Sequence, residues 1–169
     1  MPLAIHLDLL KIAMTHVAGI SERRIFWVLS GHDVHNAVTP YLAKDPGLQS
    51  GLMIAQYTAA ACVSEMQTLS NPASVANIPT SAGIEDYNSM GATSGLLALR
   101  CLELLRTVIS IELLVMAQAM EHQRPHRSGP LIERAHERIR AVVPALTGDR
   151  APSPDIAAVE QLIESGPLA

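Results

Sequence analysis

The residues from Ser89 to about His122 most strongly limit the folds open to this chain. Their pattern predicts one helix whose centre, around Ile109–Met120, is apolar nearly throughout. At about 1.5 Å per residue such a helix would be about 50 Å long. We expect the rest of the chain to be too small to cover a helix this long and apolar, which favours a place at the centre of an oligomeric bundle.

The composition agrees with a helical fold. Aromatic residues make up only 3% of the 169 residues, whereas alanine and leucine are abundant, which predicts an all-α long-helix bundle forming a single domain over 1–169. The net charge of −4 gives no basic surface for nucleic acid. The two cysteines, Cys62 and Cys101, lie in apolar helical stretches and are interpreted as free buried thiols in a reducing compartment.

The remaining helices are predicted from apolar periodicity and from capping residues. Gly19 is expected to end the first helix and Ser21 to cap the next one. Residues 30–50 read as an irregular connection. The predicted ranges are 3–18, 21–29, 50–69, 130–143 and 153–165.

Nothing in the sequence predicts export or insertion into a membrane. The first ten residues lack the basic start of a signal peptide. The longest apolar runs, Gly51–Val63 and Val108–Met120, are shorter than a membrane span requires. We therefore expect a soluble, cytoplasmic protein with no membrane partner.

The segment 70–88 is the candidate functional loop, because it is long for a compact domain and rich in proline, glycine and polar residues. It contains the adjacent carboxylates Glu85 and Asp86, whose side chains need not point the same way in a loop. Two interpretations of Glu85 stay open at this point: a functional carboxylate, or a cap on the helix that begins at Ser89.

Other polar residues are assigned structural or surface roles. His32 and His35 flank Asp33 but lack a third ligand at fixed spacing, so no metal site is predicted. Gln56 and Glu112 lie in apolar helices and are expected to form hydrogen bonds between helices. His136 is expected to be a surface histidine or one with a satisfied ring. Solvated surface is expected for the charged face of the helix 130–143, which carries Glu133, Arg134, Glu137, Arg138 and Arg140.

Several blocks resemble a known family, in the same order and at about the same spacing. They are ISERRI at 20–25, SGLMIAQYTAAACVSE at 50–65, SNPASVANIPTSAGIEDYNSMG at 70–91, RTVISIE at 106–112 and APSPD at 151–155. Together they resemble the aromatic amino acid ammonia-lyases, particularly histidine ammonia-lyase. The resemblance implies the C-terminal third of a mostly helical enzyme that assembles as a tetramer around long central helices.

The resemblance also implies a cofactor that this sequence does not encode. Ammonia-lyases use a methylidene-imidazolone electrophile that forms from an Ala-Ser-Gly tripeptide in the N-terminal half, and a tyrosine base further upstream. This chain contains Leu29-Ser30-Gly31 and Thr93-Ser94-Gly95 but no Ala-Ser-Gly. Three explanations remain: a subunit of a split enzyme, a cleavage fragment, or a noncatalytic structural or regulatory remnant.

The start at Met1 favours the split enzyme. Its partner would be an N-terminal ammonia-lyase-like chain that bears Ala-Ser-Gly and supplies both the electrophile and the tyrosine base. The two chains would form a hetero-oligomer around a tetrameric helical core. The reaction implied is elimination of ammonia from a small amino acid to give an α,β-unsaturated acid, with an aminomutase on the same scaffold as the alternative.

The resemblance assigns the site residues of this chain. Glu85 stands where histidine ammonia-lyases have glutamate in a Gln-Glu-Asp-His segment, and phenylalanine-type enzymes have glutamine. It is the predicted catalytic residue, as a proton carrier or as an acceptor for the substrate. Ile84 and Tyr87 replace Gln and His of that segment and are the predicted substrate-binding residues. Because the segment mixes the two types, the substrate stays open.

Overall fold

A computed structural model describes residues 1–35 and 38–168. Within these residues the chain is helical and contains no strand, so the predicted all-α fold is confirmed. Three short 3₁₀ turns, η1 (Pro40–Leu42), η2 (Ala73–Val75) and η3 (Ser81–Gly83), interrupt the connections. The α-helices are α1 (Pro2–Ser30), α2 (Met53–Leu69), α3 (Gly91–His122), α4 (Pro130–Val142) and α5 (Ser153–Glu164).

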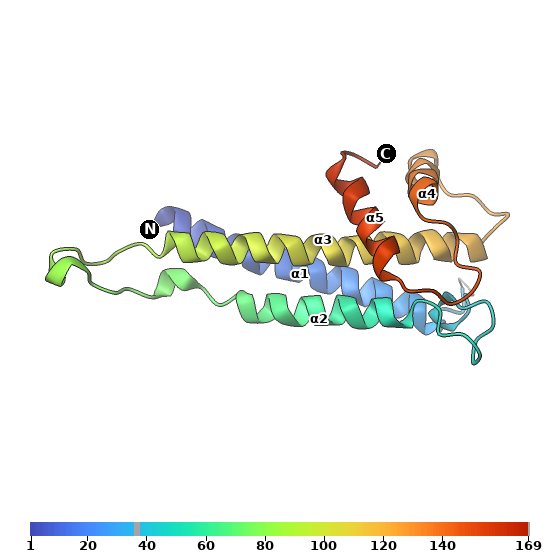
Figure 1. Ribbon diagram of the computed structural model, residues 1–169, viewed down its shortest axis with the longest axis horizontal. Coiled ribbons are helices and arrows are strands. Elements are labelled where there is room, and N and C mark those ends of the chain that lie inside the picture. The colour runs from blue at the N-terminus through green and yellow to red at the C-terminus, as the bar shows by residue number, and fades with distance from the viewer. Residues whose placement is uncertain (36–37, 169) are drawn as a thin grey trace.

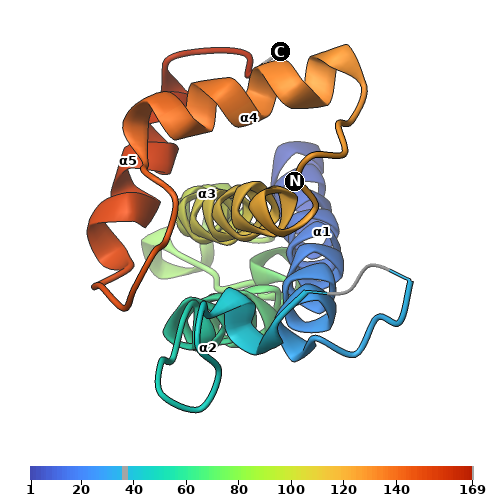
Figure 2. The same ribbon diagram turned by 90° about the vertical axis from the view of Figure 1, so that its right-hand side faces the viewer.

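The long helices α1, α2 and α3 lie side by side and form an elongated bundle (Figure 1). The most extensive packing is between α1 and α3, and α3 also contacts α2, α4 and α5. Seen along the bundle, α4 lies on the side of α3 opposite α2, and α5 lies beside α3 (Figure 2). The connection 70–90 extends beyond one end of the three-helix bundle, whereas α4 and α5 lie toward the other end (Figure 1).

The apolar core follows the seam between the three long helices. Ala55 and Ala59 of α2 are fully buried, as expected for small residues that let neighbouring helices approach closely. Their neighbours in the core are larger side chains from α1 and α3, among them Ile25, Leu29, Val108, Ile111 and Val115.

The prediction of two helices before residue 30 is wrong, because α1 continues through Gly19 to Ser30. A glycine inside a helix costs about 1 kcal/mol relative to alanine. Burial of Ala18 and Ser21 on either side of it, against the bundle, outweighs that cost. The left-handed glycine that ends the helix is Gly31, with φ 67°, and its N–H donates to the Val28 carbonyl.

Uninterrupted, α1 is long and apolar enough to cross a membrane by length and composition alone. Neither of the two shorter helices predicted on either side of Gly19 is long enough to span a membrane. The side of α1 that packs on the bundle carries buried polar residues, namely Asp8, Lys11, Ser21 and Glu22. A helix with charges on its buried side and apolar residues outside suits a bundle in which further protein covers the outer face.

The uncovered apolar surface differs from the prediction for α3. Its centre is covered, because Val108, Ile111 and Leu114 are buried against the rest of the chain. Its first half instead presents Leu96 and Leu99 to the outside, each more than half exposed. Further exposed side chains lie on α1 and α2, including Leu3, Leu9, Phe26, Trp27, Ile54 and Tyr57.

Candidate functional site

The connection between α2 and α3 folds into a narrow hairpin whose turn spans Thr80 to Glu85. The Thr80 N–H donates to the Glu85 carbonyl at 2.8 Å, and the Glu85 N–H donates back to the Thr80 carbonyl at 3.2 Å. Gly83 has φ 86°, as a sharp turn requires. Ser81 and Ala82 adopt positive φ as well, which costs on the order of 1–3 kcal/mol at each residue.

Glu85 lies at the tip of this hairpin and is oriented by its own loop. The Thr80 hydroxyl donates to Glu85 Oε2 at 2.9 Å. Helix α3 begins at Gly91 after Met90, with no side-chain hydrogen bond at its cap. The alternative interpretation of Glu85 as a helix cap is therefore wrong, and the carboxylate is exposed at the loop tip.

Ile84 and Tyr87 flank Glu85 on the same tip. Their exposed fractions are 87% and 81%, so neither side chain is packed against the bundle. Tyr87 has φ 56°, and its N–H donates to Asp86 Oδ1 at 2.7 Å. The structure therefore brings the three predicted site residues together, on a projecting surface rather than in a pocket.

Asn88 joins the two arms of the hairpin below the tip. Its Nδ2 donates to the Ile78 carbonyl at 3.1 Å and to Thr80 Oγ1 at 3.0 Å. Thr80 thus links the Asn88 amide to the Glu85 carboxylate. Sequence reasoning missed Thr80 and Asn88 as residues that orient Glu85, because only the turn brings 80, 85 and 88 together.

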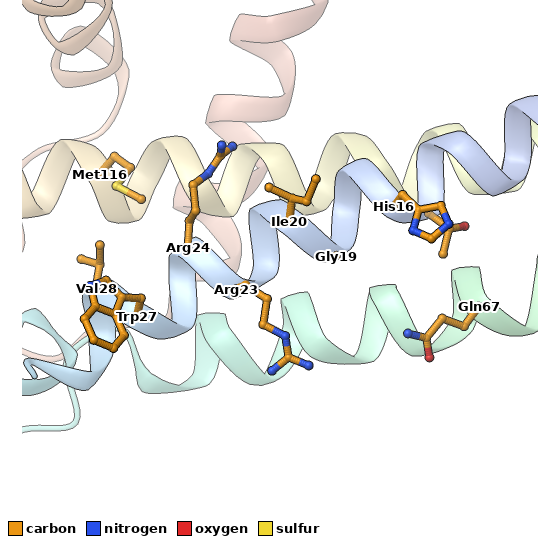
Figure 3. Close-up of a pocket in the computed structure, with 10 residues that line it drawn as sticks. His16, Gly19, Ile20, Arg23, Arg24, Trp27, Val28, Gln67 and Met116 are labelled. Atoms are coloured by element: carbon orange, nitrogen blue, oxygen red, sulfur yellow. The ribbon is translucent and has the colours of Figure 1, made fainter.

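A cavity of about 780 Å³ lies apart from the hairpin, along the outer side of α1 (Figure 3). Arg23 and Arg24 project from α1 in opposite directions beside it (Figure 3). Its lining includes His16, Ile20, Arg23 and Trp27 of α1, Gln67 of α2 and Met116 of α3. None of the three predicted site residues lines this cavity.

Polar side chains tie the three long helices together near this cavity. Ser21 and Arg24 of α1 both donate to the Glu112 carboxylate of α3, Arg24 at 2.5 Å. Gln56 of α2 donates to Glu22 Oε1 of α1 at 3.0 Å. The prediction that Gln56 and Glu112 form hydrogen bonds between helices is confirmed.

The charged face of α4 is only partly solvated, which corrects the prediction for Glu133 and makes His136 a satisfied rather than a surface histidine. Both are buried against the end of α3 and the linker that follows it. His136 Nε2 lies 2.8 Å from Glu121 Oε1. A hydrogen bond from Arg124, together with one from the Ser128 N–H, lowers the pKa of Glu133 to about 2.

Neither a reactive thiol nor a metal centre is evident in the described part of the chain. Cys101 is buried and Cys62 half-buried, and burial raises the pKa of both thiols, so neither favours the thiolate. No group of three or more His, Cys, Asp or Glu side chains within residues 1–35 and 38–168 is arranged to hold a metal ion.

The electrophile implied by the resemblance does not fit this chain's own residues. Ser30 ends α1, and Ser94 is buried inside α3. Neither follows an alanine, and a serine fixed in regular helix cannot cyclise as the tripeptide must. We therefore derive no catalytic step on a methylidene-imidazolone formed within this chain.

Comparison with known proteins identifies the family of this chain. Residues 1–141 match the family described as aromatic amino acid lyase. This match covers more than half of the chain, so the chain belongs to the aromatic amino acid lyase family.

Among individual members of the family, the chain is similar to histidine ammonia-lyases. The chain is 47% identical to the histidine ammonia-lyase of Anaeromyxobacter sp. (strain K) over 167 residues, which cover 99% of this chain and 32% of the relative. The structure matches histidine ammonia-lyase from Trypanosoma cruzi with a TM-score of 0.91 and 38% identity, covering 98% of this chain and 32% of that one.

An aminomutase shares the same fold. Tyrosine aminomutase from Streptomyces globisporus superposes with a TM-score of 0.92 and 33% identity, covering 97% of this chain and 31% of that one. The chain thus spans about a third of the length of the relatives it matches.

Proposed function

We propose that this chain is the C-terminal subunit of a split ammonia-lyase-like enzyme of the cytoplasm, active only with a partner chain. The enzyme eliminates ammonia from a small amino acid and releases an α,β-unsaturated acid. The partner bears the Ala-Ser-Gly motif and supplies the methylidene-imidazolone, whose role is to activate the amine as a leaving group. This chain supplies the Glu85 hairpin.

The observation that carries the proposal is the exposed, strained tip. A carboxylate between two uncovered side chains, Ile84 and Tyr87, cannot exclude water by itself. Strain at Ser81, Ala82 and Tyr87 is typical of backbone held for a functional site. A facing chain that covers the tip would turn this open surface into the dry site that removal of a carbon-bound proton requires.

Within that site Glu85 is the proton-handling or substrate-binding group. Its Oε2 is occupied by the Thr80 hydroxyl, which leaves Oε1 for the substrate or for a proton. We expect the side chains of Ile84 and Tyr87, which lie on the same tip, to contact the substrate and to exclude water around that oxygen. The hydrogen bond from the Thr80 hydroxyl orients the carboxylate.

The assembly follows from the uncovered apolar faces of α1, α2 and α3. Contiguous exposed side chains such as Leu96, Leu99 and Leu102 are typical of surfaces that pack against other protein. We expect the chain alone to be insoluble or self-associated, and coexpression with the partner to give a large hetero-oligomer with a tetrameric helical core. A well-folded, soluble monomer by light scattering would contradict this.

The experiment coexpresses this chain with an Ala-Ser-Gly-bearing chain that corresponds to the missing two thirds of the relatives. Ammonia release and the ultraviolet absorbance of the unsaturated acid are followed with histidine, tyrosine and phenylalanine. We expect activity from the complex and none from this chain alone. Activity of the purified single chain, or a stable complex inactive on every amino acid, would refute the split enzyme.

An aminomutase is the second candidate, because a tyrosine aminomutase shares the fold. Such an enzyme would return ammonia to the β carbon, so the same assay separates the two functions by product. An α,β-unsaturated acid that accumulates with stoichiometric ammonia indicates a lyase. A β-amino acid formed without free ammonia indicates an aminomutase.

A further inference from the structure

A buried ion pair lies where the hairpin joins the bundle. Lys11 of α1 is fully buried, and its Nζ lies 2.9 Å from Oδ1 of Asp8, which is 2% exposed. Placing two charges out of water is costly unless each is paired and hydrogen-bonded. Sequence reasoning missed this pair. The usable signal was the presence of two opposite charges three residues apart in an otherwise apolar helix.

Besides contacting each other, both members of the pair form hydrogen bonds with the first residues of the connection 70–90. Asp8 Oδ2 accepts the Ser74 N–H of η2 at 2.8 Å. Lys11 Nζ donates to the Asn71 carbonyl at 3.0 Å, two residues after α2 ends. The pair therefore holds two points of the backbone in the first turn of the loop.

The connection 70–90 ends at the start of α3, close to the same ion pair. Ser94, in the first turns of α3, lies beside Asp8 and is fully buried. Although burial raises the pKa of a carboxyl group, the Lys11 ammonium and the hydrogen bond from the Ser74 N–H outweigh it and keep the pKa of Asp8 well below its usual range. Asp8 therefore stays an ionised acceptor between the start of the loop and the first turns of α3.

We propose that Asp8 and Lys11 are positioning residues that fix the angle at which the hairpin leaves the bundle, and through it the location of Glu85. The hairpin is internally tied by Thr80, Glu85 and Asn88, so it behaves as one arm. A rotation at the base of such an arm is enlarged at its tip. The catalytic consequence of this inference rests on the proposed function; the structural one does not.

Two double variants separate loop positioning from general stability. D8L/K11M replaces the pair by apolar side chains of similar size, which removes both charges and the acceptor for the Ser74 N–H. D8N/K11M removes both charges as well, but the amide that replaces the carboxylate keeps an oxygen that accepts that N–H. Replacing a buried pair as a whole avoids leaving one charge unpaired, so both proteins are expected to fold.

The control is D155L/R150M, at the other end of the molecule. Arg150 is paired with Asp155 at 2.7 Å and donates to the Pro144 carbonyl, also at 2.7 Å. Like Lys11, it joins an ion pair to a backbone carbonyl. The control therefore removes an ion pair and its hydrogen bond to the backbone, in a more exposed setting, without touching the loop.

The first measurement is amide hydrogen exchange in the full chain, in its assembled form. In D8L/K11M we expect the Ser74 amide to exchange about 10–100-fold faster, since it loses a charge-assisted hydrogen bond. We expect D8N/K11M to recover much of that protection, and α3 amides from 107 to 117 to be unchanged in all three variants. Unchanged exchange at 70–77 in D8L/K11M, or equal acceleration along α3, would overturn the proposal.

The second measurement is the kinetics of the active complex. D8L/K11M is expected to lower kcat more than it raises KM. D8N/K11M, which loses the Lys11 bond to the Asn71 carbonyl but keeps an acceptor for the Ser74 N–H, is expected to lower kcat less, and the control is expected to stay close to the wild type. Equal kcat for the two loop variants would contradict positioning through the Ser74 hydrogen bond. A wild-type complex without activity refutes the proposed function instead, and the exchange experiment still decides whether Asp8 and Lys11 fix the loop.

Discussion

Replacing Gly51 by alanine perturbs the turn that leads into α2, at a point where the structure leaves no space. Gly51 has φ 54°, and an added Cβ would overlap the Tyr41 carbonyl oxygen and lie 3.0 Å from the Ala43 nitrogen. These atoms are backbone, and the Tyr41 carbonyl also accepts the Leu52 N–H at 2.9 Å. The overlap therefore cannot be relieved by rotating a side chain.

The expected cost combines two effects. A left-handed conformation costs an alanine about 1–2 kcal/mol. Forcing packed backbone apart costs about 1–3 kcal/mol more, which gives about 2–5 kcal/mol in all for Gly51→Ala. Gly47 is the matched control in the same connection, since it has φ 94° but nothing within 4 Å of an added Cβ. For Gly47→Ala we expect only the conformational cost of about 1–2 kcal/mol.

The assay is guanidinium denaturation of the assembled protein, followed by far-ultraviolet circular dichroism. The midpoint is expected to fall clearly further for Gly51→Ala than for Gly47→Ala, with unchanged slopes. Equal shifts for the two variants, or a Gly51→Ala protein as stable as the wild type, would refute the packing described around Tyr41.

Three further predictions concern individual side chains. The low pKa of Glu133 means that its contribution to stability is complete above about pH 4.5 and is lost as the pH falls toward 2. Glu133→Gln should remove this part of the pH dependence of the melting temperature. A variant with the pH profile of the wild type would contradict this prediction. Glu112→Leu leaves the Ser21 hydroxyl buried without its acceptor and should lower the free energy of unfolding, measured by denaturation, by about 1–3 kcal/mol. A decrease below about 0.5 kcal/mol would show that the hydrogen bond between Ser21 and Glu112 is not formed. Thr80→Val removes the donor to Glu85, so kcat of the complex should fall while its assembly, measured by light scattering, is retained; an unchanged kcat would mean that Thr80 does not orient Glu85.

The helices were largely predictable because their apolar periodicity matches the faces that are buried. Helices α2 to α5 begin and end within about three residues of the predicted positions. Gly19 misled the prediction because local propensity says nothing of the packing of α1 on α3. The burial of Glu133 was missed for a related reason, since only the fold brings α4 back onto the end of α3.

Sequence reasoning selected the candidate residues of the loop but did not predict their geometry. The composition of the loop and the family resemblance selected Ile84, Glu85 and Tyr87, and the structure places them on one tip. The left-handed conformations of Ser81 and Ala82 had no signal in the sequence, because such positions usually carry glycine or asparagine. The catalytic and binding roles of Ile84, Glu85 and Tyr87 stay predictions.

The central claim is that Glu85 carries chemistry in a site completed by another chain, and kcat of Glu85→Gln in the assembled complex tests it most directly. Glutamine keeps the shape and an acceptor for Thr80 but removes the charge. The matched control is Asp86→Asn, which alters the adjacent carboxylate and keeps an oxygen for the Tyr87 N–H. We expect kcat to fall by about 10²–10⁴-fold for Glu85→Gln if it transfers a proton, or KM to rise instead if it binds the substrate, with Asp86→Asn near normal. An intact complex in which Glu85→Gln has wild-type kcat and KM would contradict the claim and leave this chain with a structural part only.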